Sequence, residues 1–112
     1  MINTTLNTVG TLLNSFHSTW HMPTLQLVNN AWQDRTPEAL LEAVRHTGQA
    51  VTSLEHLERS VARLAEREGS TITPEEAWYI ANEIEELECS LLQIVTELGS
   101  LAIEIAEECE LA

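Results

Sequence analysis

Two pairs of glutamates with the spacing ExxE are the residues of this chain whose types and spacing could do chemistry. Glu83 and Glu86 form one pair, and Glu104 and Glu107 form the other. Side chains three residues apart lie on the same face of a helix. Paired carboxylates on neighbouring helices can hold Mg²⁺ against a triphosphate. The chemistry that these pairs would support is Mg²⁺-dependent hydrolysis of a nucleoside triphosphate.

The two ExxE pairs resemble the acidic motifs of the all-helical nucleoside triphosphate pyrophosphohydrolases of the MazG type, which lie on different helices. The resemblance implies an all-α enzyme that releases pyrophosphate. In this chain the second pair lacks the family's Asp, and a straight helix holds the two pairs about 31 Å apart. Only a break at Gly99 and Ser100 would bring them together. This enzyme is the alternative function, and we predict a protein without catalytic residues or cofactors.

Histidines and cysteines offer no stronger motif. His17 and His21 stand four residues apart, a spacing that can present two imidazoles to one metal, but no further ligand follows at a diagnostic interval. We therefore predict solvent-facing or Asn-bonded histidines and no metal. Cys89 and Cys109 lie about 30 Å apart on one predicted helix, too far for a disulfide. Two free thiols are typical of a reducing cytoplasm.

The charge of the chain is its most pronounced feature. Residues 74–112 contain eleven glutamates and no Lys or Arg, and the whole chain has a net charge of −13. Such a surface repels nucleic acids and anionic membranes and attracts basic proteins. We therefore predict a basic protein partner, no direct contact with nucleic acid and no membrane. The residues expected to bind the partner are glutamates without a predicted ion pair: Glu85, Glu86, Glu88, Glu104, Glu107, Glu108 and Glu110.

The same stretch has an apolar residue every three or four positions, which predicts a long helix with one face that needs a covering partner. Thr36 with Pro37, and Thr73 with Pro74, are helix start signals. They predict two helices of equal length, residues 37–68 and 74–105, joined as an antiparallel hairpin. The apolar positions of the last helix are Ala77, Ile80, Ile84, Leu87, Leu91, Ile94, Leu98, Leu101 and Ile105.

Folding this hairpin about Thr71 places residues of opposite charge across from one another. Exposed ion pairs of this kind add about 0.2–1 kcal/mol each, so they set the register of the hairpin more than its stability. The predicted pairs are Arg67 with Glu75, Arg59 with Glu83, and Arg45 with Glu97.

Residues 1–33 carry no charged side chain. Apolar residues at steps of four and three predict a helix from Met1 to about Trp20, and Pro23 is expected to stop or kink it before a short helix ends near Asp34. The opposite face is polar but uncharged, so we predict that this helix packs against protein and forms the self-association surface of a homodimer. The residues expected there are Ile2, Leu6, Val9, Leu13, Phe16 and Trp20.

These patterns predict one all-α domain, residues 1–112, in which neutral N-terminal helices (1–35) lie along a long acidic helical hairpin (36–112). The bundle is expected to be coiled-coil-like and dimeric. The predicted function is a small cytoplasmic binding protein that engages and inhibits a basic partner, as immunity proteins, anti-defence factors and DNA mimics do. Mimicry requires the dimer, because one helix carries a charge about every 5 Å against about 1.7 Å in DNA. The alternatives are the enzyme above and a purely structural coiled-coil scaffold.

Overall fold

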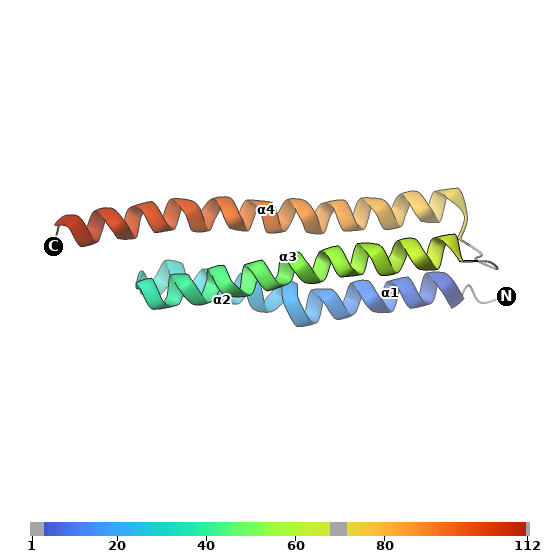
Figure 1. Ribbon diagram of the computed structural model, residues 1–112, viewed down its shortest axis with the longest axis horizontal. Coiled ribbons are helices and arrows are strands. Elements are labelled where there is room, and N and C mark those ends of the chain that lie inside the picture. The colour runs from blue at the N-terminus through green and yellow to red at the C-terminus, as the bar shows by residue number, and fades with distance from the viewer. Residues whose placement is uncertain (1–3, 68–71, 112) are drawn as a thin grey trace.

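The computed structural model describes residues 4–67 and 72–111, and the regular elements within these ranges are all helical (Figure 1). The predicted all-α class is confirmed. We call the first three elements the N-terminal rod, because they follow one another without a break. In chain order the elements are α1 (Thr4–Phe16), the π-helical turn η1 (His17–His21), α2 (Met22–Asp34), α3 (Pro37–Glu66) and α4 (Pro74–Leu111).

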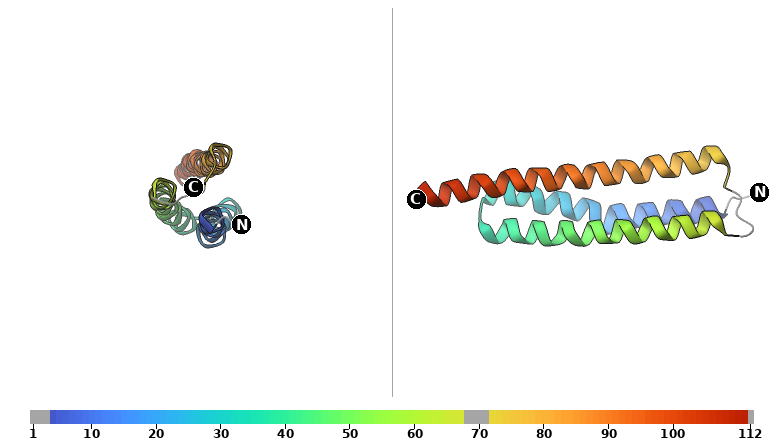
Figure 2. Two further views of the ribbon diagram at one scale, coloured as in Figure 1. Left: turned by 90° about the vertical axis from the view of Figure 1, so that its right-hand side faces the viewer. Right: turned by 45° about the horizontal axis from the view of Figure 1, so that its top comes forward.

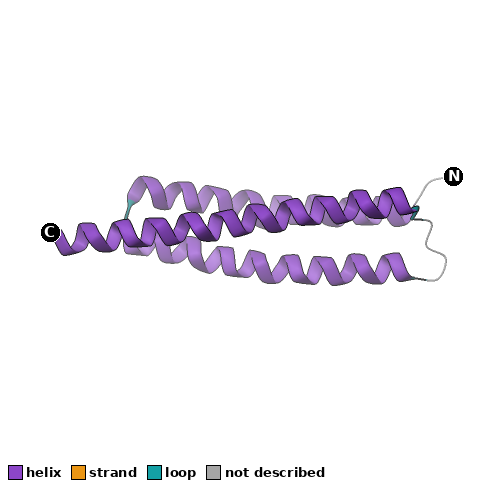
Figure 3. Cartoon of the chain, turned by 90° about the horizontal axis from the view of Figure 1, so that it is seen from above, coloured by secondary structure: helices purple, strands orange, loops and turns teal. Residues whose placement is uncertain are grey.

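The N-terminal rod, α3 and α4 form three helical rods that pack side by side in an elongated molecule of 64 × 19 × 16 Å. Viewed along the long axis, they occupy the corners of a triangle (Figure 2). Consecutive rods run in opposite directions, so α3 is antiparallel to the N-terminal rod and to α4 (Figure 1). Seen from above, α4 lies over the other two rods, and its C-terminal end projects beyond the turn between α2 and α3 (Figures 1 and 3).

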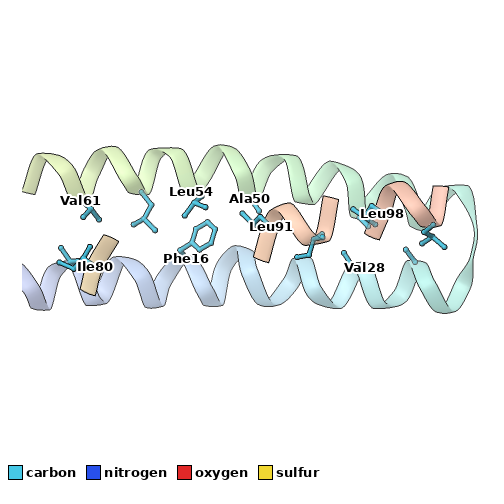
Figure 4. Packing of buried hydrophobic residues seen from close by; sticks show 14 of the residues in the cluster. Phe16, Val28, Ala50, Leu54, Val61, Ile80, Leu91 and Leu98 are labelled. Atoms are coloured by element: carbon cyan, nitrogen blue, oxygen red, sulfur yellow. The ribbon is translucent and has the colours of Figure 1, made fainter. Parts of the chain in front are cut away.

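The core is made by one apolar stripe from each rod. Phe16 of α1 and Leu54 of α3 point toward one another with Leu91 of α4 beside them, and Leu98 of α4 lies further along the core near Val28 of α2 (Figure 4). Full burial of a side chain of this size contributes about 1.5–3 kcal/mol, so these stripes hold the rods together. The predicted apolar positions of α4 from Ile80 onward are buried or half-buried, and Ala77 is exposed.

Both predicted helix starts are confirmed by their capping hydrogen bonds. The backbone N–H of Ala39 donates to the Thr36 hydroxyl oxygen at 3.2 Å, and the N–H of Glu76 donates to the Thr73 hydroxyl oxygen at 3.1 Å. Each bond satisfies an amide that the first helical turn leaves without a partner. α3 ends at Glu66, and the predicted end at residues 68–70 lies outside the described residues.

Pro23 does not stop the N-terminal rod, so of the two predicted outcomes, a stop or a kink, the stop is wrong. Proline has no N–H to donate, and its ring crowds the carbonyl group one turn earlier. The chain accommodates it with the wider π-helical turn, in which the N–H of Met22 bonds to the carbonyl oxygen of His17. The hydroxyl of Thr24 donates to the carbonyl oxygen of Trp20 at 2.6 Å. The rod therefore continues through the proline to Asp34.

α4 is continuous through Gly99 and Ser100. The break that the enzyme alternative requires is therefore absent, and the two ExxE pairs lie far apart on one helix. By length and composition α4 is also the one helix, in the described ranges, that could cross a membrane, with a mean hydropathy of 1.4 over its most apolar window. Such a helix is weak evidence for a membrane protein, because core helices of soluble bundles share these properties. Only 28% of that window is buried inside the structure, which leaves much of an apolar helix uncovered.

Candidate partner-binding groove

α3 and α4 each carry a second stripe of mostly small and apolar residues, which begins one position after the core stripe. The steps are again three and four residues, so each stripe forms a continuous line along its helix. All members are exposed except Glu58 and Ala102, which are half-buried. We call the surface between the two stripes the α3–α4 groove. Its α3 side consists of Leu41, Val44, Gly48, Val51, Glu55, Glu58, Ala62 and Ala65. Its α4 side consists of Ala81, Glu85, Glu88, Leu92, Val95, Gly99, Ala102 and Ala106.

Two hollows follow one another along this groove. One has a volume of about 500 Å³ and is lined mainly by alanine and by the edges of core residues, with Ala62 on α3 and Ala81 on α4. The other has a volume of about 440 Å³ and is lined by larger apolar side chains, among them Leu92, which is 67% exposed, and Val95, which is 49% exposed. Glu58 and Glu88 line both hollows and therefore lie where they meet.

Glu58 of α3 and Glu88 of α4 face one another across the groove. A hydrogen bond from protonated Glu58 to Glu88, then burial, then the charges of Glu88 and Glu55 raise the pKa of Glu58 to about 7. The pKa rises because two carboxylates this close cannot both ionise without strong repulsion. Glu85 lines the first of these hollows and Glu55 lines the second. In the described ranges this group of four glutamates has no ion pair, so its negative charge is uncompensated.

Glu104 and Glu108 belong to a different arrangement, which corrects the prediction that they form no ion pair, while their role in partner binding stays a prediction. Arg35, in the turn between α2 and α3, forms ion pairs with both carboxylates. Its Nε donates to Oε1 of Glu108 at 3.0 Å, and these carboxylates raise the pKa of the guanidinium. The backbone of Arg35 is left-handed, with φ 53°, and its N–H bonds to the carbonyl oxygen of Ala31 at 2.9 Å. The pair Glu104 and Glu108 therefore helps to fix α4 on the α2–α3 turn.

The other glutamates predicted to bind the partner separate into two sets. Glu85 and Glu88 line the groove. Glu86, Glu107 and Glu110 are exposed on α4 but do not line either hollow. The structure therefore concentrates the predicted acidic contact surface at Glu85 and Glu88 and adds the α3 residues beside them.

The three predicted ion pairs of the hairpin are wrong. Within residues 4–67 and 72–111, Arg35 alone forms ion pairs, and those reach Glu104 and Glu108. The contact between Glu58 and Glu88 centres the pairing of α3 and α4 on residue 73, since (58 + 88)/2 = 73, rather than on residue 71. A shift of two residues in the centre moves every facing position by four residues, about one helical turn. Each glutamate that was predicted as a partner therefore lies about one helical turn away from the position that faces its arginine.

The residues predicted for self-association serve the fold of the single chain. Val9 and Phe16 are buried in the core, and Leu13 and Trp20 pack against it. Within one chain Val9 and Phe16 are thus already covered, and Leu13 and Trp20 are covered in part, while contact with a second copy stays a prediction. Ile2 and the side chain of Leu6 lie outside the described residues.

The groove on α3 was missed because all apolar residues of this helix were assigned to one stripe, which put Leu41, Val44 and Val51 together with core residues although the structure leaves them exposed. The second stripe was visible as Leu41, Val44 and Val51 at heptad spacing, each one position after a core residue. Alanine, glycine and glutamate complete the stripe, so its mean hydropathy is low. Helices with two such stripes offset by one residue contact neighbours on two sides.

His17 and His56 are exposed, as predicted, whereas His21 and His46 differ from the prediction of solvent-facing or Asn-bonded rings. His21 Nε2 lies 2.9 Å from the hydroxyl oxygen of Ser90, and His46 Nδ1 lies 2.7 Å from that of Thr24. The single hydroxyl proton of Thr24 goes to the carbonyl of Trp20, so His46 must be the donor in its bond to Thr24. These bonds connect the N-terminal rod to α3 and α4.

No protein-family model, curated protein or solved structure matches the chain. The functional conclusion therefore depends on the groove and its charge.

Proposed function

We propose that this chain is a small acidic binding protein that holds a basic amphipathic helix of a protein partner in the α3–α4 groove, and that occupation of this helix inhibits the partner. The observation that carries the proposal is the uncovered second stripe on two neighbouring helices, with an uncompensated cluster of glutamates at its centre. A cytoplasmic location remains part of this proposal.

The shape of the groove suits a helix. Three packed rods with an open groove between two of them leave the fourth position of a four-helix bundle vacant. A helix in this position would pack its apolar residues against heptad stripes on both neighbours, as helices in bundles do. The stripe on α3 extends from Leu41 to Ala65, about 36 Å at the usual helical rise. This length accommodates a partner helix of about 25 residues.

The charge of the groove favours a basic helix over a second copy of this chain. Glu55, Glu58, Glu85 and Glu88 lie in the middle of the groove, with alanines on one side of them and Val51, Leu92 and Val95 on the other. Lysines or arginines of a partner would supply the cation that the four glutamates lack. Two copies joined through this groove would bring two such glutamate clusters together, and like charges in close contact oppose association.

A synthetic peptide tests the proposal directly. The probe is a fluorescein-labelled amphipathic helix of about 25 residues, with lysine at the middle heptad positions and leucine and alanine at the heptad positions on either side. Fluorescence anisotropy at physiological salt should show saturable binding to the wild-type chain. We expect Glu88→Lys to weaken binding at least tenfold, because it removes an acceptor for lysine and adds a like charge. Leu92→Asn should weaken binding several-fold, because it removes an apolar contact surface beside Val51 and Val95.

Two matched variants separate the groove from general charge attraction. Glu86→Lys changes the net charge by the same amount as Glu88→Lys, but Glu86 does not line the groove, so it should alter affinity less than twofold. Met22→Asn is the control for Leu92→Asn, because Met22 is 53% exposed on α2 away from the groove. Equal losses in Glu86→Lys and Glu88→Lys would show non-specific attraction to an acidic surface. Absence of binding by the wild-type chain would refute the proposed groove.

A further inference from the structure

A second candidate site lies at the π-helical turn, away from the α3–α4 groove. His17 and His21 occupy the two ends of η1, and their Nδ1 atoms lie 2.9 Å apart. The ring centroids are 5.0 Å apart and the ring planes are inclined by 55°. π-Helical turns inside α-helices frequently occur at functional sites.

The local sequence enforces this turn. Pro23 lacks the N–H that would continue the α-helical pattern, and the N–H of Met22 instead closes the wider turn onto the carbonyl oxygen of His17. The position of His21 is fixed from a second helix, because its Nε2 lies 2.9 Å from the hydroxyl oxygen of Ser90 on α4. The His17 ring is exposed and the His21 ring is half-buried. The ring of His21 is thus held in place by Ser90, and the ring of His17 is free to rotate.

The hydrogen bond between the two rings holds a single proton. At 2.9 Å, one Nδ1 must carry the proton and the other must accept it. Burial, then the charge of His17, lower the pKa of His21. A neutral imidazole binds a metal ion through the ring nitrogen that carries no proton.

We propose that His17 and His21 chelate one divalent transition-metal ion, of the Cu²⁺ or Ni²⁺ class, through their Nδ1 atoms. The ion takes the place of the proton between the rings, and that proton passes through solvent to Nε2 of the ring that held it, so that both imidazoles stay neutral. A small rotation of His17 then directs both Nδ1 lone pairs at the metal. With metal–nitrogen bonds of about 2.0 Å, two ligands at a right angle are about 2.8 Å apart, and two ligands at the tetrahedral angle are about 3.3 Å apart. The observed separation of 2.9 Å fits the right angle of square-planar or octahedral ions better than tetrahedral zinc.

Ser90 has the role of an outer partner in this site. A metal-binding histidine usually donates its other ring N–H to a nearby oxygen, which fixes the tautomer and the ring orientation. If Nε2–H of His21 donates to Ser90, then Nδ1 is free for the ion. Among the described residues, no group of three or more His, Cys, Asp or Glu side chains could hold a metal. Water therefore completes the coordination shell, and the site is open to exchangeable ligands.

Calorimetric titration of the full chain with Ni²⁺ at pH 7.5 tests the site, because Ni²⁺ does not oxidise the two free thiols. We expect one saturable site that is weakened at least tenfold in His17→Ala and in His21→Ala. His56→Ala is the matched control, since His56 is an exposed histidine on α3, and its affinity should stay within twofold of wild type. Ser90→Ala should weaken binding by a smaller factor, because it removes the oxygen that fixes the His21 ring.

His17→Ala keeps the test independent of folding, because this exposed side chain makes its hydrogen bond only with His21. Unchanged circular dichroism together with lost Ni²⁺ binding would support the chelate. Ni²⁺ binding that persists in both His17→Ala and His21→Ala would overturn it and assign the ion to other surface ligands. A wild-type chain with no saturable Ni²⁺ binding would overturn it as well.

Discussion

At the scale of single residues, the carboxyl of Glu58 connects the stability of the chain to pH. Its pKa in the folded chain is about 7, raised from an ordinary value of 4.5 by the hydrogen bond to Glu88. Between these two values the folded chain binds more protons at this position than the unfolded chain. The stabilising contribution is therefore fully present below about pH 4.5 and is lost as the pH rises through about 7.

Thermal unfolding followed by circular dichroism checks this linkage. We expect the melting temperature to fall by several degrees between pH 5 and pH 8, and Glu58→Gln to remove a large part of that fall, because the amide keeps the hydrogen bond to Glu88 without titrating. Glu42→Gln, an exposed glutamate on the same helix, is the control and should keep the wild-type slope. Identical slopes in the two variants would contradict the assignment to Glu58.

At the scale of the element, two glycines in the second stripes oppose the stability of their own helices. Gly48 lies within α3 and Gly99 within α4, and a Cβ atom added at either would meet nothing within 4 Å. Glycine in a helix interior costs about 0.5–1 kcal/mol relative to alanine. Gly48 and Gly99 therefore lower the stability of their helices at two positions that line the groove. The absence of a side chain at these positions would allow the backbone of another helix to approach closely.

Gly48→Ala and Gly99→Ala test this reading of the groove floor. Each should raise the free energy of unfolding by about 0.5–1 kcal/mol in urea denaturation, because alanine reduces the entropy lost on folding. The double variant should at the same time weaken binding of the amphipathic peptide several-fold, since two methyl groups raise the groove floor. Gly10→Ala on α1, which also has open space around its Cβ position, should leave peptide binding unchanged. Greater stability without any loss of binding would mean that the partner helix does not approach these glycines.

At the scale of the whole molecule, the charge distribution decides between a second copy and another protein as occupant of the groove. The N-terminal stripe that motivated the homodimer prediction is largely covered within one chain. Because the groove is acidic at its centre, we expect light scattering at pH 8 and low salt to give the 12.5 kDa of a single chain. A mass of 25.0 kDa, twice 12.5 kDa, would restore the homodimer, and its loss in Leu92→Asn would place the second copy in the groove.

The sequence by itself determined the features that depend on neighbours a few residues apart. Thr36 and Thr73 mark the starts of α3 and α4 because a capping hydroxyl bonds to an amide three residues later. The core stripe of α4 followed from its heptad spacing for the same local reason. Even the charge of the groove could be foreseen in part, since Glu85 and Glu88 were among the predicted contact residues.

Only the tertiary structure decided how the helices are shifted and rotated against one another. A shift of two residues in the centre of the α3–α4 pairing brings Glu58 onto Glu88 and removes the predicted arginine partners. Arg35 meets Glu104 because a left-handed turn directs the chain there, over a separation of 69 residues. Each of α3 and α4 has two stripes at the same spacing, and spacing alone does not say which one is buried. The N-terminal rod covers one stripe of each helix and leaves the other open, because burial depends on which face meets a neighbour in space.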